Sequence, residues 1–570
     1  MTLLRVTVAQ LNPTVGDFAG NVENMLRAAR TAEQARADLV VFPELSLTGY
    51  HPGDLLDEPA FTTAIEHALE EVAQKTRDTP SLAWVVGAPL RRQGPGKRWH
   101  NSLLVVSRGE FLLTYQKQLL PTYDVFDERR HFEPGPDTAQ VLQFKDVRVG
   151  FLICEDGWND ALVAYAHNPF ERLADAGPDL VISINASPSN VGKREERHAL
   201  FTAASRRHGL PLLYVNQVGG HDQIVFDGAS FAVMPSEGVV FEANRFAEDV
   251  ITLDFASGAF IAPSAVSAPA EGLSVMEFYR RQIVLGLRDY ARRSGFSRAL
   301  VGCSGGIDSA LTLALAVEAL GADKVVAVTM PSHYSSTGSV EDSRRLCENL
   351  GVRLFEHPIR DLVDGYTAGF HAAWGQPLDG VALENVQARI RGTILMEYSN
   401  AFGHLLLTTG NKSELSVGYC TLYGDTNGGL GLIGDLYKTE VFELSRHLNR
   451  EAARELVPQS ILDKEPSAEL APGQRDTDSL PPYTILDTVL KLVIEGQRLG
   501  REETPAVEAA YARIVATDEG RALVRRVRKM VARNEYKRRQ EPPILRVRGR
   551  AFGSGRQMPI AASYDFWERA

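Results

Sequence analysis

Residues 303–309 (CSGGIDS) constrain the fold more than any other short stretch of this chain. They lie between a predicted strand at 298–302 and an apolar stretch at 309–320 that is typical of a buried helix. Glycines between a strand and a helix let backbone N–H groups approach an anion, and the helix N-terminus adds a favourable partial charge. The segment therefore predicts a phosphate-binding loop, although it lacks the lysine of a GxxxxGK[ST] motif. The alternative, a glycine turn into a core helix, would leave both serines and Asp308 without a role.

The predicted elements after this loop alternate between strand and helix. Strands are expected at residues 324–330 and 354–358, with a helix at 339–350 between them. Two successive strand–helix–strand units predict a parallel, doubly wound sheet, because right-handed crossovers place consecutive parallel strands side by side. The second half of the chain is therefore expected to be an α/β domain of Rossmann-like type.

The length of 570 residues predicts more than one domain. Hydrophobic residues make up 44% and charged residues 23% of the chain, which is the composition of a folded protein with large cores. Residues 257–271 (SGAFIAPSAVSAPAE) are small, proline-containing and without periodicity, as is typical of a linker. We therefore expect one domain at residues 1–256, a linker at 257–271 and a second domain at 272–570.

The formal net charge of −11 argues against a protein that binds nucleic acid over its whole surface. One segment departs from this average, because residues 521–556 contain 13 Lys and Arg against 2 Glu. Such a run is either a solvated face or an anion-binding element. We favour phosphate binding and subunit contact over a solvated face.

No apolar run approaches the roughly 18 residues of a membrane span, and the opening residues MTLLRVTVAQ indicate a strand rather than a signal peptide. The cysteines form no CxxC pair, so neither a disulfide framework nor structural zinc is indicated. These features predict a cytoplasmic protein with no membrane partner and no nucleic-acid partner.

Three residues of the first half together match one chemical need. Cys154 follows the buried run RVGFLI, Glu44 follows an apolar strand in VVFPELSLTGY, and Lys117 precedes a proline turn in YQKQLLPTY. Taken singly, each is better explained without a catalytic role: Cys154 as a buried thiol, Glu44 as a solvated carboxylate and Lys117 as a surface amine. Amide hydrolysis by a thiol, however, requires a base for its proton, a nucleophile and a cation beside the developing oxyanion. The three residues therefore predict a Glu–Lys–Cys amidase site.

The motifs FPELSLTGY, YQKQLLPTY and ICED, in that order, resemble those of the carbon–nitrogen hydrolase (nitrilase) superfamily over about the first 255 residues. The resemblance implies an α-β-β-α sandwich. It assigns Glu44 as general base, Lys117 as oxyanion stabiliser and Cys154 as nucleophile. It also implies that three residues hold a glutamine substrate: Tyr123, Ser187 and Lys193.

SGGIDS resembles the pyrophosphate-binding signature of the N-type ATP pyrophosphatases, which cleave ATP to AMP and pyrophosphate while adenylating a carboxyl or carbonyl oxygen. Four further motifs, ENVQARIR, LTTGNKSELSVGYCTLYGD, DLYKTEV and NEYKRRQ, resemble the NAD synthetases. The whole chain thus resembles the glutamine-dependent NAD synthetases. The resemblance implies an ATP site formed by Gly302, Cys303, Ser304, Gly305, Gly306, Ile307, Asp308, Ser309 and Thr409. It implies a deamido-NAD⁺ site formed by Asn385, Arg389, Glu414, Asp425 and Lys537.

Asp308 and Glu414 are the magnesium ligands that the resemblance implies. Oxygen ligands suit Mg²⁺, and a metal that bridges triphosphate oxygens reduces their repulsion of an incoming carboxylate. For Asn385 and Arg389 the alternative is a satisfied helix face, because residues four apart lie on the same side of a helix.

The resemblance implies an enzyme that amidates deamido-NAD⁺ to NAD⁺ with ATP and with ammonia from L-glutamine, releasing AMP, pyrophosphate and L-glutamate. A homo-oligomer is expected. Two alternatives stay open. One is a related amidotransferase that acts on another carboxyl or carbonyl substrate, and the other is a nucleotide-binding regulator whose amidase half is a degenerate docking module.

Residues 464–482 (KEPSAELAPGQRDTDSLPP) are too polar and too rich in proline for a core. An irregular segment of this length within a compact domain is more often functional than a simple connector. We therefore expect a lid over a site.

Overall fold

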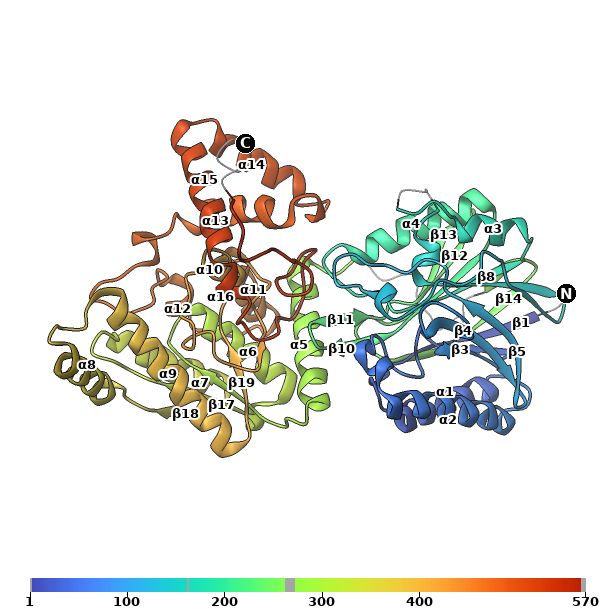
Figure 1. Ribbon diagram of the computed structural model, residues 1–570, viewed down its shortest axis with the longest axis horizontal. Coiled ribbons are helices and arrows are strands. Elements are labelled where there is room, and N and C mark those ends of the chain that lie inside the picture. The colour runs from blue at the N-terminus through green and yellow to red at the C-terminus, as the bar shows by residue number, and fades with distance from the viewer. Residues whose placement is uncertain (1–2, 161–163, 262–271, 565–570) are drawn as a thin grey trace. The chain divides into compact units, whose positions relative to one another are not determined.

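The computed structural model describes residues 3–160, 164–261 and 272–564 of the chain. It forms two compact units, Met1–Gly219 with Phe226–Gly272 and Gly220–Val225 with Leu273–Ala570 (Figure 1). The second unit therefore includes a short segment of the first half, the tip of the hairpin formed by β10 (Val218–His221) and β11 (Ile224–Asp227). Residues 262–271, most of the predicted linker, lie outside the described residues.

The first unit contains the other strands of the first half and four helices. The strands are β1 (Leu3–Gln10), β2 (Leu39–Val41), β3 (Ala83–Arg91), β4 (Trp99–Ser107), β5 (Glu110–Gln116), β6 (Val141–Phe144), β7 (Val147–Ile153), β8 (Leu180–Asn185), β9 (Leu212–Asn216), β12 (Phe231–Met234), β13 (Gly238–Glu242), β14 (Asp249–Ala256) and β15 (Ala259–Ile261). The helices are α1 (Phe18–Gln34), α2 (Pro59–Lys75), α3 (Pro169–Asp175) and α4 (Lys193–His208). Short 3₁₀ turns are η1 (Gly53–Asp57), η2 (Thr76–Asp78), η3 (Glu128–Arg130) and η4 (Cys154–Gly157).

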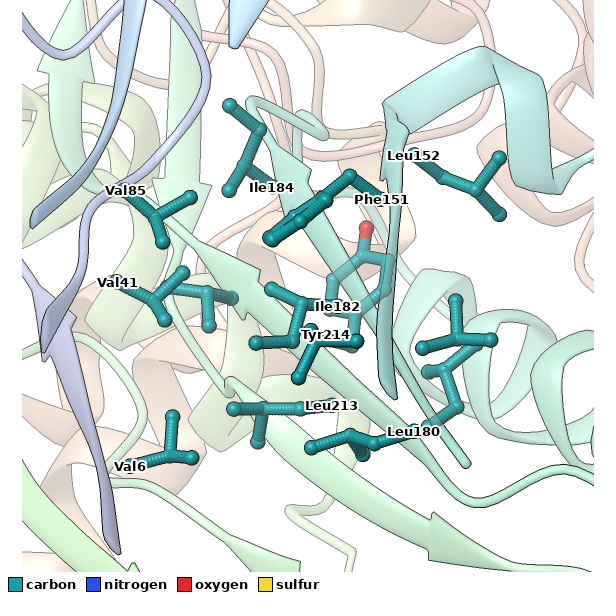
Figure 2. Packing of buried hydrophobic residues seen from close by; sticks show 14 of the residues in the cluster. Val6, Val41, Val85, Phe151, Leu152, Leu180, Ile182, Ile184, Leu213 and Tyr214 are labelled. Carbon is teal, nitrogen blue, oxygen red and sulfur yellow. The ribbon is translucent and has the colours of Figure 1, made fainter. Parts of the chain in front are cut away.

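The strands of the first unit form two sheets that pack face to face. One has the order β15-β14-β1-β2-β3-β4-β5 and the other the order β13-β12-β9-β8-β7-β6. Apolar side chains of both sheets share one core, which includes Val41 and Val85 from the first and Phe151, Ile182 and Leu213 from the second (Figure 2). Strand β8 is buried at every residue, which explains why apolar residues predominate in its run LVISI.

Helices cover the outer faces of both sheets. α1 and α2 lie side by side (Figure 1), and their apolar residues, including Met25 and Val72, pack in a second cluster with Phe42 and Trp84. α3 and α4 contact β7 and β12 of the other sheet. The unit is therefore an α-β-β-α sandwich, which confirms the predicted fold.

The second unit contains a five-stranded sheet and twelve of the described α-helices. The strands are β16 (Ala299–Gly302), β17 (Val325–Thr329), β18 (Arg353–Glu356), β19 (Leu405–Thr408) and β20 (Leu430–Gly431). The helices are α5 (Val275–Arg293), α6 (Ile307–Leu320), α7 (Thr337–Leu350), α8 (Arg360–Trp374), α9 (Gly380–Phe402), α10 (Lys412–Val417), α11 (Lys438–Glu451), α12 (Gln459–Asp463), α13 (Tyr483–Leu490), α14 (Thr504–Val515), α15 (Asp518–Arg533) and α16 (Glu535–Arg538). Shorter turns are η5 (Ala322–Lys324), η6 (Asp476–Asp478), the π-helical η7 (Lys491–Glu495) and η8 (Gly496–Arg498).

This sheet is parallel throughout and has the order β18-β17-β16-β19-β20. The chain runs outward from β16 to β18 and then returns to the other side of β16 with β19. Such a reversal of strand order is where open α/β sheets bind their ligands. The predicted doubly wound sheet is confirmed, and α6 begins two residues earlier than predicted, with extended Gly306 at its N-cap.

Within the described residues, no helix combines the length and the apolar character that a membrane span requires.

Candidate active sites

Cys154 lies where strand β7 ends. It is the first residue of η4, has a φ of 43° and is 6% exposed. Left-handed φ values are uncommon for residues other than glycine and often occur at functional sites. The charges of Glu44 and Lys117 act on its thiol, so the fold brings the three predicted amidase residues into one site.

Lys117 joins two buried carboxylates. Its Nζ donates to Glu44 Oε1 at 2.7 Å and to Glu128 Oε1 and Oε2 at 2.8 and 3.0 Å. Glu44 also accepts from Asn101 Nδ2 at 2.7 Å and from the backbone N–H of Ala186 at 2.9 Å. Buried charges are stable only when they are paired. Since one lysine here pairs with two carboxylates, an excess of negative charge remains beside the thiol.

The electrostatics of this site keep the resting thiol protonated. Burial raises the pKa of Cys154 well above its usual value, and Glu44 raises it further, whereas Lys117 lowers it. Burial also raises the pKa of Glu44, against the opposing effect of Lys117. Burial alone would lower the pKa of Lys117, but Glu128 and Glu44 raise it well above its usual value. The site thus combines a neutral thiol, a carboxylate of increased basicity and a permanent cation.

Glu128 is a residue that the sequence analysis missed. It begins η3 within the charged stretch DERRH, which on sequence alone indicates a solvated surface. In the structure it is 1% exposed and accepts from Tyr50 Oη at 2.8 Å as well as from Lys117. No local sequence signal distinguishes it from a surface carboxylate.

Two of the three predicted glutamine-binding residues, Tyr123 and Lys193, contact the turn that begins with Cys154 or the residue that ends it. Tyr123 is half-exposed, and its hydroxyl donates to both oxygens of Glu155 at 3.0 Å. Lys193 pairs with a neighbouring carboxylate of α4, and its Nζ lies 3.8 Å from the ring centroid of Trp158, which ends the turn. Ser187 is buried, and its N–H donates to Asn216 Oδ1 at 2.9 Å.

The second unit has a cavity of about 590 Å³ at the carboxyl ends of β16 and β19. Its walls come from the glycine loop, from α9, from the segment after β19 and from residues 464–479. Eight of the nine predicted ATP-binding residues line it: Gly302, Cys303, Ser304, Gly306, Ile307, Asp308, Ser309 and Thr409.

Gly305, the ninth, packs against α7 instead. Its φ is +76°, and a Cβ atom there would lie 2.3 Å from the carbonyl oxygen of Ser339, so only glycine fits. Ser309 Oγ closes the loop, donating to the carbonyl of Gly306 at 3.0 Å and accepting from the N–H of Ser304 at 3.3 Å. The result is a compact turn at the N-terminus of α6 that suits a phosphate group.

Asp308 and Glu414, the predicted magnesium ligands, both bind Lys438. Its Nζ donates to Asp308 Oδ2 at 2.6 Å and to Glu414 Oε1 at 2.8 Å. Burial raises the pKa of Glu414 to about 7, against the opposing effect of Lys438. The sequence analysis assigned no role to Lys438, although it belongs to the motif DLYKTEV.

These donors fit an Mg²⁺ ion that binds together with a nucleotide. Mg²⁺ is usually held by one or two carboxylates and by substrate phosphates rather than by an all-protein cage. Asp308 and Glu414 both line the cavity and supply two such carboxylates. Lys438 is the positive charge that pairs with them in this structure.

Four of the five predicted deamido-NAD⁺ residues line the same cavity: Asn385, Glu414, Asp425 and Lys537. Thr421 connects two of them, because its hydroxyl donates to Asn385 Oδ1 at 2.8 Å and its N–H donates to Asp425 Oδ1 at 2.6 Å. Lys537 Nζ donates to the carbonyls of Gly418 and Cys420, each at 2.7 Å.

Arg389, the fifth, is exposed and does not belong to the cavity lining. Its Nε donates to the carbonyl of Leu422 at 3.2 Å. Arg391, which the sequence analysis did not select, lines the cavity, and its Nε donates to the carbonyl of Met330 at 3.1 Å. Residues two apart on a helix point in different directions, so the motif ARIR presents only one of its arginines to the cavity.

The predicted lid contributes to the cavity wall. Glu469 accepts from Ser339 Oγ at 2.7 Å and from Lys464 Nζ at 2.9 Å. Gln387 of α9 donates to the carbonyl of Leu470 at 2.9 Å. These bonds hold the segment against α7 and α9, and residues of both helices line the cavity.

The basic residues of 521–556 differ in their burial. Most of those on α15, such as Arg525 and Arg526, are exposed, whereas Arg538, Arg546, Arg548 and Arg556 are buried. Arg548 donates to Glu495 Oε1 and to Tyr279 Oη, each at 2.7 Å. Among the described basic residues of this segment, Lys537 is the one that lines the cavity. Much of the buried charge therefore serves internal ion pairs.

The two halves of the chain match two family models. Residues 5–260 match carbon-nitrogen hydrolase, and residues 279–541 match NAD synthase. The fold and the two sites thus define a carbon–nitrogen hydrolase fused to an NAD synthase.

Curated relatives and a solved structure match the chain over nearly its whole length. The glutamine-dependent NAD(+) synthetase of Synechocystis sp. is 44% identical and covers 99% of each chain. That of Thermotoga maritima is 38% identical over 98% of this chain and 99% of its own. The structure of glutamine-dependent NAD+ synthetase from Acinetobacter baumannii in complex with ADP is 35% identical, covers 98% of each chain and has a TM-score of 0.76. The chain belongs to the glutamine-dependent NAD(+) synthetase family.

Proposed function

We propose that this protein forms NAD⁺ from deamido-NAD⁺ with L-glutamine as nitrogen donor, while ATP is converted to AMP and pyrophosphate. One observation carries the proposal: a single chain holds both a buried Cys154 beside Glu44 and Lys117 and a cavity lined by a glycine-rich phosphate loop. Hydrolysis of glutamine supplies ammonia. A carboxylate is a poor electrophile, so ATP is needed to activate it before ammonia attacks.

In the first unit, Glu44 removes the proton of the Cys154 thiol, and the thiolate attacks the side-chain amide carbon of glutamine. Lys117 stabilises the oxyanion of the tetrahedral intermediate. Glu44 returns the proton to the leaving ammonia, and water then hydrolyses the thioester to glutamate. The raised pKa of Glu44 supports this role, because burial makes the carboxylate a stronger base. Tyr123, Ser187 and Lys193 hold the glutamine.

In the second unit, the loop 302–309 and Thr409 bind ATP. The nicotinate carboxylate of deamido-NAD⁺ attacks the α-phosphorus, and pyrophosphate leaves toward the backbone N–H groups of the loop. Mg²⁺, held by Asp308 and Glu414, would reduce the negative charge of the triphosphate. Lys438, which borders the same cavity, adds a further positive charge. Ammonia then attacks the adenylated carboxyl carbon, and AMP leaves.

Asn385, Asp425 and Lys537 are proposed to bind deamido-NAD⁺ within the cavity, and Arg389 at its exposed margin. Asp425 and Asn385 are linked through Thr421, which supports a common role. Arg391 adds a cation to the cavity wall.

The proposal is tested with purified full-length protein, ATP, Mg²⁺, deamido-NAD⁺ and L-glutamine. We expect NAD⁺, AMP and glutamate to appear together, with AMP and NAD⁺ in equal amounts. AMP release with another carboxyl substrate, but not with deamido-NAD⁺, would indicate the related amidotransferase. Absence of glutamate formation would indicate that the first unit is a docking module.

We also propose that the reaction takes place in the cytoplasm. All four cysteines are free, which suits a reducing compartment. The reaction also consumes ATP.

A homo-oligomer is also part of the proposal, with a second copy of the chain covering α8. This helix exposes Leu362, Tyr366, Phe370 and Trp374, which are spaced by four residues and lie along one face. Exposed contiguous apolar residues of this kind are typical of interaction surfaces.

The double substitution Tyr366→Glu and Trp374→Glu is expected to convert the oligomer to monomer, because it places charge in the buried interface. Light scattering coupled to size-exclusion chromatography measures the mass. His371→Glu, at an exposed position of α8 outside the apolar face, is the control and should leave the mass unchanged. An unchanged mass for the double variant would exclude α8 as the interface.

A further inference from the structure

Asp156 lies two residues after Cys154, and the proposed reaction assigns it no role. Its side chain is fully buried and accepts four hydrogen bonds. Oδ1 accepts from the backbone N–H groups of Gln118 at 3.0 Å and Leu119 at 2.8 Å. Oδ2 accepts from Tyr115 Oη at 2.7 Å and from the backbone N–H of Ile153 at 3.3 Å.

These four donors flank the two residues on which the proposed chemistry depends. Tyr115, Gln118 and Leu119 lie on both sides of Lys117, and Ile153 directly precedes Cys154. The carboxylate therefore links the chain around the proposed oxyanion stabiliser to the turn that carries the proposed nucleophile.

The sheets do not provide this link. Lys117 directly follows β5, which is an edge strand of the seven-stranded sheet, and Cys154 follows β7 of the six-stranded sheet. Two strands of different sheets share no ladder of backbone hydrogen bonds, so the strand register cannot fix the distance between the residues that follow them. Side-chain contacts between the two sheets must set this distance.

We propose that Asp156 is a positioning residue for glutamine hydrolysis, which holds the Lys117 segment at the distance from Cys154 that oxyanion stabilisation requires. The inference rests on the proposed function of the first unit. Asp156 acts through Lys117 and Cys154 and does not contact glutamine. A displacement of about 1 Å in such an arrangement can lower the rate about 10²-fold.

The arrangement suits a carboxylate, because each of its oxygens accepts two hydrogen bonds. In asparagine, an NH₂ group in place of Oδ1 would face two backbone N–H groups and satisfy neither, and one in place of Oδ2 would leave the N–H of Ile153 without its acceptor. Burial raises the pKa of Asp156 to about 7, although its donors and the charge of Lys117 oppose that rise. The site retains this buried carboxylate despite its desolvation, and the bonds that it accepts are what offset the cost.

Asp156→Asn in the full-length protein tests the proposal. We expect kcat for glutamine hydrolysis to fall about 10²-fold with little change in the KM for glutamine, because the attacking geometry is lost but the substrate contacts remain. NAD⁺ formation from ammonium chloride should be unchanged, because the second unit catalyses it. Alkylation of Cys154 by iodoacetamide should become slower, since a displaced Lys117 no longer lowers the pKa of the thiol. Tyr115→Phe removes one donor of four and should lower kcat by less.

Asp38→Asn is the matched control. Asp38 accepts from the backbone N–H of Arg5 at 2.9 Å and from Lys145 Nζ at 2.7 Å, so it also joins separate segments of the chain. It lies just before β2, whereas Glu44 lies beyond the other end of that strand. This variant should retain the kcat of the wild type.

Three results would overturn the proposal: an unchanged kcat in Asp156→Asn, a rise in KM without a fall in kcat, or an unchanged alkylation rate. Should Asp156→Asn fail to fold, Tyr115→Phe decides, and an unchanged kcat in that variant overturns the proposal. Failure of the proposed function is distinguishable, because the wild-type protein would then hydrolyse no glutamine.

Discussion

Cys154→Ala is expected to abolish NAD⁺ formation from glutamine and to leave NAD⁺ formation from ammonium salt intact. Removal of the nucleophile prevents the thioester, and we expect a loss of at least about 10³-fold with glutamine. The ATP-cleaving cavity is lined entirely by residues of the second unit, so free ammonia can still attack an activated carboxyl group there. NAD⁺ is measured with each nitrogen donor at saturating ATP and deamido-NAD⁺.

Cys154→Ser is the second variant of this experiment. It preserves the size of the side chain, but a hydroxyl is far harder to deprotonate than a thiol, so glutamine-supported activity should also be lost. Retained glutaminase activity in either variant would show that Cys154 is not the nucleophile. Failure of ammonium to support Cys154→Ala would contradict the division of the reaction between the two units.

Asp308→Ala is expected to lower NAD⁺ formation about 10²- to 10³-fold with both nitrogen donors and to leave glutamine hydrolysis intact. Asp308 lies in the first turn of α6, where Lys438 Nζ and Asn411 Nδ2 donate to its carboxylate at 2.6 and 2.9 Å. Its loss removes a proposed metal ligand and leaves Lys438 paired with Glu414 alone. Loss of one group that stabilises developing charge lowers rates by about 10²- to 10³-fold. AMP release and glutamate formation, measured in the same reaction, separate the two activities.

Asp323→Ala is the control for this variant, because Asp323 is an exposed carboxylate beyond the C-terminal end of α6. It should retain both activities. Asp308→Asn keeps the shape of the side chain while removing its charge, and it should lose AMP release as well. Normal ATP-to-AMP conversion in both Asp308 variants would exclude the proposed metal site.

The phosphate loop and the sheet around it could be predicted because their signals are local. Gly305 and Gly306 follow a short apolar strand and precede an apolar helix, and the alternation of strand and helix continues to β18. Backbone conformation and hydrophobic periodicity are properties of short segments, so the sequence carries them directly. The order of β19 on the other side of β16 needed the structure.

Within the amidase site, residue chemistry was predictable but the partners of each charge were not. Cys154, Glu44 and Lys117 stand in recognisable motifs, whereas Glu128 lies in a stretch that is indistinguishable from a solvated turn. Its burial follows from the fold of the chain around Lys117. On sequence alone, Asp156 is only a carboxylate near a cysteine.

In the second unit, too, the residue types of the motif ARIR and of the basic C-terminal segment were predictable, but their surroundings in the fold were not. Helical spacing implies that Arg389 and Arg391 point in different directions, but it does not say which direction is the cavity. The charge of Arg548 was visible in the sequence, while its partner Glu495 lies 53 residues away.

By itself, the sequence determined the two α/β units, the phosphate loop at residues 303–309 and the residue types of both sites, because each depends on neighbours along the chain. Only the tertiary structure decided that Glu128 completes the ion pairs of Lys117, that Asp156 joins the Lys117 and Cys154 segments, and that Lys438 lies between Asp308 and Glu414. The physical reason is that a buried charge is stabilised by whichever opposite charges and donors surround it in space, and those groups come from elements that are distant in sequence.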